Sequence, residues 1–137
     1  MEIVHHDLRI ELPDGWWAEA GMADFRPCGD AYRAANDAVP ERRLFVVRIE
    51  DISPVRRGTG VGIFNDCRET GRTARERVVS ILRGFRAGAS LPPVEVVRTP
   101  ADRLPCKLKD GTHRLYCSLA AGFSHVPAVD TDALYCG

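Results

Sequence analysis

Five consecutive residues, Asp110 to Arg114 in the stretch KLKDGTHRLYCSLAAG, have the chemistry of an anion site at the start of an expected helix. A helix N-terminus presents unpaired backbone N–H groups and the positive end of the helix dipole, and both favour an anion. Gly111 would let the backbone approach that anion closely, and Thr112 could cap the helix or bind an oxygen. His113 and Arg114 add hydrogen-bond donors, and the planar guanidinium suits phosphate. One interpretation of the pattern is a phosphate site formed by Gly111, Thr112, His113 and Arg114.

Asp110 has the wrong charge to bind a phosphate itself. Its carboxylate could instead bind Mg²⁺ held by the phosphates, or it could brace the turn. A purely structural alternative also fits the motif, with Asp110-Gly111 as a tight turn and Thr112 as an ordinary helix cap. The five residues alone leave both interpretations open.

The elements around the motif predict an α/β domain with a small mixed sheet and flanking helices. Thr73 and Glu76 fit a capping box at the start of one helix, and Gly88 and Gly122 are placed to end the two helices. Apolar patterning and turn residues predict strands at about 43–52, 94–98, 105–109 and 125–129, and helices at about 73–87 and 112–121.

The N-terminal part predicts a hairpin-like extension. Residues 3–12 alternate, which indicates a half-buried strand with Val4 facing the core and His5 on the opposite face. After a turn at 13–15, Trp16 and Trp17 are expected to open the second strand and to pack on the core. Residues 29–39 could form a short helix with Asp30 as its cap. We expect one domain over 1–137, with an extension at 1–42, a core at 43–129 and a tail at 130–137.

The formal net charge of zero hides an asymmetry along the chain. Residues 41–114 hold 16 Lys and Arg against 9 Asp and Glu, whereas the two flanks together hold 3 basic and 10 acidic residues. The basic middle could attract a phosphate-bearing partner, or the acidic flanks could fold against it. Of the arginines on the 73–87 helix, we expect most to be solvated and one or two to reach a phosphate.

The five cysteines are odd in number, scattered and without a C-x-x-C pair, so free thiols are expected. Cys106, His113 and Cys117 lie close in sequence but lack a fourth ligand, so no zinc is expected and Cys117 is interpreted as a small buried hydrophobe. No run of roughly 18 apolar residues and no signal-peptide pattern occurs, which predicts no membrane association and a cytoplasmic location.

The order of strand, loop, capped helix, PPVEVVR, short strand and DGTHRLYCSLAAGFSHVPAV resembles the ParB/sulfiredoxin-like superfamily. The resemblance covers about 43–129 and is most specific over 93–129. It implies that Gly111, Thr112, His113 and Arg114 bind the phosphates of ATP or another nucleotide. Sulfiredoxins have a cysteine where this chain has Thr112, and ParB partition proteins have a glutamate that it lacks, so neither activity is expected.

The nearest motif in that superfamily is the Asp-Gly-His-His-Arg of small-molecule kinase-like members, with Thr112 replacing the first histidine. The resemblance implies Mg²⁺ at Asp110, with Asp110 and His113 as catalytic candidates, for phosphoryl transfer or nucleotide hydrolysis. An upstream glutamate would be the base, and Glu50, Glu69 and Glu76 are all possible.

Three functions follow as hypotheses. The first is binding of a nucleotide or phosphorylated small molecule, with or without catalysis. The second is a nucleic-acid-binding or nuclease-like module, favoured by the basic middle. The third is a non-catalytic interaction protein whose site has decayed.

Overall fold

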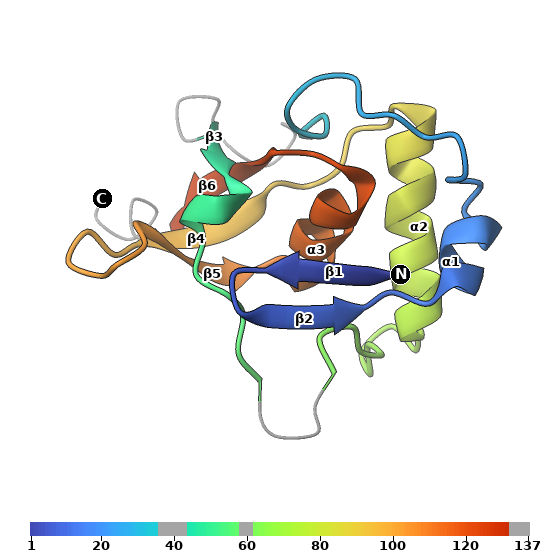
Figure 1. Ribbon diagram of the computed structural model, residues 1–137, viewed down its shortest axis with the longest axis horizontal. Helices are drawn as coiled ribbons and strands as arrows, with labels where there is room; N and C mark the ends of the chain where they lie inside the picture. Colours follow the sequence, from blue (N-terminus) through green and yellow to red (C-terminus); the bar gives the residue numbers. More distant parts are fainter. Residues whose placement is uncertain (36–43, 58–61, 132–137) are drawn as a thin grey trace.

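The computed structural model describes residues 1–35, 44–57 and 62–131. In these residues six strands and three α-helices follow the order β1, β2, α1, β3, α2, β4, β5, α3, β6 (Figure 1). The strands form a two-stranded sheet and a four-stranded mixed sheet. The predicted α/β class with a mixed sheet is therefore confirmed.

The four-stranded sheet has the strand order β3-β6-β4-β5. β6 pairs in parallel with β4 and antiparallel with β3, and β5 pairs antiparallel with β4. The strands are β3 Leu44–Arg48, β4 Val94–Arg98, β5 Cys106–Asp110 and β6 His125–Asp130. The last three lie where the sequence predicts them. The strand expected over 43–52 ends at Arg48, because a 3-10 turn at Ile49–Asp51 follows.

The two long helices begin and end at the predicted residues. α2 (Ala74–Ala87) starts with a complete Thr73–Glu76 capping box and stops at Gly88, which adopts a left-handed conformation. α3 (Thr112–Ala121) is the most buried helix and contacts α2, β1, β4 and β6, so it joins both sheets to the rest of the core. None of the helices in the described part of the chain is long and apolar enough to cross a membrane.

The N-terminal hairpin differs from the prediction. The chain reverses between β1 (Glu2–His5) and β2 (Leu8–Glu11), with His6 at a positive φ of 56°. Trp16 and Trp17 lie not in a strand but in the short helix α1 (Asp14–Glu19), which Pro13 precedes with a φ compatible with a helix start. Both tryptophans pack partly buried against the core, as expected.

The predicted orientation of the first strand is also wrong. Val4 is 49% exposed, whereas His5 is fully buried. His5 tolerates burial because both ring nitrogens are bonded, Nδ1 to the Tyr116 hydroxyl at 2.9 Å and Nε2 to the Ile49 carbonyl at 3.0 Å. In this alternating strand the polar His5 therefore faces the core and the apolar Val4 faces solvent.

The expected helix over 29–39 is absent from its described part. Residues 29–35 are irregular, and Ala34 forms an isolated parallel bridge with Leu91. The rest of that prediction lies outside the described residues, as do residues 132–137 of the predicted tail.

The acidic flanks of the chain form ion pairs with arginines of its basic middle. These pairs are Asp7–Arg56, Glu19–Arg75 and Asp130–Arg98. Arg83 also donates to the Glu19 carbonyl. The acidic flanks thus fold against part of the basic middle, and several of its arginines are already neutralised within the molecule.

Candidate functional site

The Asp110–Arg114 motif lines a cleft of about 490 Å³ between α2 and the start of α3. Leu91 and Pro92, just before β4, close one side of it. Four arginines line the same cleft: Arg57, Arg72, Arg77 and Arg114. Asp110 is the only acidic side chain among the described lining residues, so the cleft carries a positive charge.

Helix α3 begins where the sequence predicts, but its N-cap is a different residue. Gly111 is the N-cap, with φ 105°, and no side chain caps the helix. Thr112 is the first helical residue, so of the two roles considered for it, capping the helix is excluded. The first N–H groups of α3 therefore lack a side-chain cap and adjoin the cleft.

Close packing against β4 gives Gly111 a second physical reason to be glycine. A Cβ at this position would lie 2.8 Å from Val94 Cγ1 and 3.0 Å from Val94 Cβ. Such contacts are sterically excluded without a backbone shift, and the positive φ independently disfavours other residues. The glycine thus seats α3 on the sheet and positions its N-terminus.

Internal hydrogen bonds hold two of the arginines in place. Arg77 donates to the Asn65 carbonyl at 2.9 Å and to its side-chain oxygen at 2.8 Å. Arg114 is 18% exposed; it donates to the Pro93 carbonyl at 3.1 Å and lies 3.6 Å from the Asp110 carboxylate. A guanidinium fixed in this way is prepared to bind an anion with little further loss of entropy.

The other two cleft arginines form fewer hydrogen bonds within the protein. Arg72 has one weak bond, to the Glu76 carbonyl at 3.3 Å. The Nε of Arg57 is buried and has no hydrogen-bond partner among the described residues. A buried donor without an acceptor costs free energy, which an incoming anion would recover.

His113 is in the cleft wall, but it is not a cation. It is 5% exposed, and its Nε2 accepts a hydrogen bond from the Asn65 amide at 3.1 Å. Burial, with smaller contributions from the positive charges of Arg77, Arg57 and Arg114, lowers the pKa of His113 to about 4. The imidazole is therefore neutral near pH 7, chiefly because it is buried and secondarily because the cleft is positively charged.

Asp110 has an acidic neighbour that the sequence analysis did not identify. Glu95 on β4 pairs with Asp110 on β5 across a β-bulge. Burial raises the pKa of the Glu95 carboxyl, and the hydrogen bond and negative charge of Asp110 raise it further. The result is a carboxyl pair beside Arg114, at the edge of the arginine cleft.

None of the three glutamates proposed as a base lines the cleft. Glu76 is bonded to Thr73 in the capping box, Glu50 lies 3.7 Å from His6, and Glu69 is exposed. Cys117 is fully buried, as expected of a small hydrophobe. The described residues include no cluster of three or more His, Cys, Asp or Glu that could hold a metal.

The residues that the sequence analysis missed are Glu95, Arg57 and Arg72. A signal existed for Glu95, since it is the one charged residue inside the apolar strand VEVV. Arg57 and Arg72 flank loops far from residue 110 in sequence, and only the fold brings them to the cleft. Arg77 belongs to the helix from which one or two arginines were expected to reach a phosphate.

Comparisons with protein-family models, curated proteins and solved structures gave no significant match. The function of the cleft must be inferred from its own residues.

Proposed function

We propose that the arginine cleft binds the phosphates of a nucleotide or of a phosphorylated small molecule. The observation that carries this proposal is the convergence of four arginines on the uncapped N-terminus of α3. Guanidinium groups and helix amides are the two protein groups best suited to phosphate oxygens. The resemblance of 93–129 to the ParB/sulfiredoxin-like superfamily supports the same ligand class.

We further propose that a divalent cation binds beside these phosphates. Asp110 and Glu95 can supply carboxylate oxygens to Mg²⁺, which usually takes one or two carboxylates and completes its shell with phosphate oxygens and water. Phosphoryl transfer or nucleotide hydrolysis would then rest on positioning and charge neutralisation. His113 would serve by orienting the Asn65 loop, since a neutral imidazole with its Nε2 already bonded is poorly placed to donate a proton at pH 7.

Nucleic-acid binding is the second candidate, because the same arginines could bind a backbone phosphate. The ion pairs of Arg56, Arg75 and Arg98 with the acidic flanks argue against an extended basic surface. A single concave cleft favours a mononucleotide or small phosphate ester over a long polyanion.

Thermal unfolding with a set of probes tests the proposal. Inorganic tripolyphosphate and ATP, each with and without Mg²⁺, should raise the melting temperature, while adenosine should not. At a ligand concentration of 100 times Kd the expected stabilisation is about 2.7 kcal/mol, or roughly 8 °C. No shift with either polyphosphate at 5 mM would refute a phosphate site. A shift whose size grows with oligonucleotide length would favour the second candidate.

Arg72→Gln is the most informative variant, since Arg72 is exposed and makes only one weak internal bond. We expect it to weaken tripolyphosphate binding by about tenfold, the usual value of a charge-assisted contact. Arg68→Gln removes an exposed arginine of the same loop that does not line the cleft, so it is the matched control. Equal affinity of both variants would contradict the role of the cleft.

A further inference from the structure

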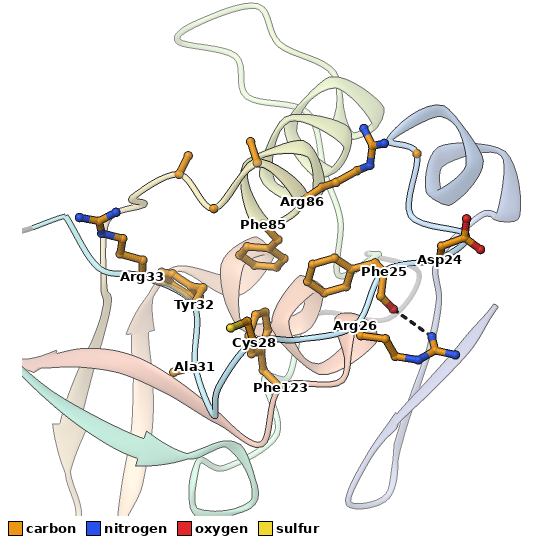
Figure 2. A pocket seen from close by; sticks show the side chains of 14 residues that line it. Asp24, Phe25, Arg26, Cys28, Ala31, Tyr32, Arg33, Phe85, Arg86 and Phe123 are labelled. Carbon is orange, nitrogen blue, oxygen red and sulfur yellow. Dashed lines mark hydrogen bonds between the residues drawn. The ribbon is translucent and has the colours of Figure 1, made fainter.

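A second hollow, of about 540 Å³, lies between the C-terminal end of α2 and the irregular segment after α1. It shares no lining residue with the arginine cleft. Figure 2 shows four aromatic rings gathered at its centre, contributed by Phe25, Tyr32, Phe85 and Phe123. Its volume is in the range of small-molecule sites.

The rings form a fixed aromatic surface. Tyr32 stacks on Phe85 at a centroid distance of 5.4 Å, and Phe123 meets Phe85 edge-on at 5.3 Å and Phe25 at 6.2 Å. The Tyr32 hydroxyl donates to the Pro92 carbonyl at 2.6 Å, which holds that ring in place. Phe25 is only half-buried, so part of the aromatic surface remains accessible.

The rim of the hollow is positively charged. Among the described lining residues are three arginines, Arg26, Arg33 and Arg86, and one acid, Asp24. The guanidinium groups of Arg33 and Arg86, which flank the rings on two sides in Figure 2, form no hydrogen bond or ion pair with any described residue. Two uncommitted guanidinium groups beside exposed aromatic area are complementary to a molecule that carries both a ring and a negative charge.

The helix end limits how much negative charge such a molecule can carry. Ala87 and Gly88 at the C-terminus of α2 line the hollow, and this end of a helix carries partial negative charge on its carbonyls. A polyphosphate would be repelled there more strongly than a monoanion bound at the rim. The hollow and the arginine cleft therefore favour different anions.

From these contacts we propose that the hollow is a binding site for a small aromatic carboxylic acid. The ring packs on Phe25 and Tyr32, and the carboxylate binds Arg33 or Arg86. This site is independent of the proposed phosphate site.

Protection of Cys28 from alkylation tests this proposal in the full-length protein. Cys28 is exposed and lines the hollow, so a bound acid should shield its thiol. We expect 10 mM phenylacetate to slow its reaction with iodoacetamide at least threefold, measured by peptide mass spectrometry. Acetate should have no effect, and the neutral isostere 2-phenylethanol should protect far less. Cys67, which lies outside the hollow, should react at the same rate throughout, and buried Cys117 should react only if the protein unfolds.

Two variants separate the contributions of charge and space. Arg33→Gln combined with Arg86→Gln should raise the phenylacetate concentration needed for half-maximal protection about tenfold, and Ala31→Phe should abolish protection by filling the hollow. In Arg72→Gln, which alters only the arginine cleft, phenylacetate should protect Cys28 as it does in the wild type. A failure of this proposal can therefore be distinguished from a failure of the proposed phosphate site. Absence of protection, equal protection by 2-phenylethanol, or full protection in the double arginine variant would each overturn the proposal.

Discussion

The packing of Gly111 fixes the geometry of the proposed phosphate site. A Cβ on residue 111 would lie within 3.0 Å of the Val94 side chain, so close packing against Val94 requires glycine at this position. The same close approach puts the first amides of α3 at the arginine cleft. A requirement imposed by the sheet thus positions the groups that would contact a phosphate.

Replacing Gly111 with alanine tests this packing argument. Gly29 has nearly the same φ, 107° against 105°, but nothing lies within 4 Å of its virtual Cβ. We expect Gly29→Ala to cost about 1–2 kcal/mol from the backbone alone, and Gly111→Ala to cost about 3 kcal/mol or more because the clash adds to it. Urea unfolding measures both, and equal costs would show that packing on Val94 is unimportant.

His113 should make the protein sensitive to acid. Its pKa is about 4 in the folded protein and 6.5 in the unfolded chain. The unfolded state therefore binds more protons between these values, and stability should fall as the pH drops from about 6.5 to 4, by up to about 3 kcal/mol. The test is the difference between wild type and His113→Asn in urea unfolding across this range. A difference that does not change with pH would contradict the buried, neutral imidazole.

Elements whose signals are local could be predicted from the sequence. The capping box of α2 and the glycines that end α2 and α3 depend only on residues within one turn, so the local sequence pattern indicates them. β4 and β6 are short apolar runs bounded by proline, glycine or charge, and they too lie where expected.

Elements that depend on distant partners could not be predicted. His5 faces inward because Tyr116 and Ile49 bond its ring, and neither partner is near it in sequence. Only part of the candidate site could be predicted from the sequence, because some of its residues are also brought in by distant packing. Its α3 residues are consecutive, whereas Arg57, Arg72 and Glu95 reach it only through the packing of α2 and the pairing of β4 with β5.

The pairing of β4 with β5 makes a prediction about the carboxyl pair. Since Asp110 raises the pKa of Glu95, the NMR titration midpoint of the Glu95 carboxyl should lie above 4.5 and should fall in Asp110→Asn. Mg²⁺ together with tripolyphosphate should also lower that midpoint, because a bound cation favours the carboxylate. If Asp110→Asn leaves the midpoint unchanged, the two carboxyls do not interact.

Across the whole molecule, charge is distributed so that two concave regions remain lined by arginines. The acidic flanks pair with Arg56, Arg75 and Arg98, while the arginines of the cleft and of the aromatic hollow form no ion pair with those flanks among the described residues. A chain of zero net charge can in this way keep strongly positive concave regions.

His5 connects the N-terminal hairpin to the rest of the molecule. Its Nδ1 accepts from the Tyr116 hydroxyl, whose oxygen in turn accepts from the Val55 amide at 3.0 Å, and its Nε2 donates to Ile49. One buried network therefore joins β1, α3 and the chain after β3. This arrangement predicts that the extension and the core unfold together as one domain.

His5→Phe should consequently destabilise the whole protein. The substitution removes the acceptor of the Tyr116 hydroxyl proton and one of the two donors to the Ile49 carbonyl, although Val55 and Ile52 still donate to these two oxygens. We expect the loss of both buried hydrogen bonds to cost about 1–3 kcal/mol. Val4→Thr, at the exposed neighbouring position of the same strand, should change stability by less than about 0.5 kcal/mol. In native-state hydrogen exchange the β1–β2 amides of the wild type should open with the same free energy as the amides of α3. Hairpin amides that exchange through a much lower opening free energy, with α3 unaffected by His5→Phe, would show instead that the extension is an independently unfolding unit.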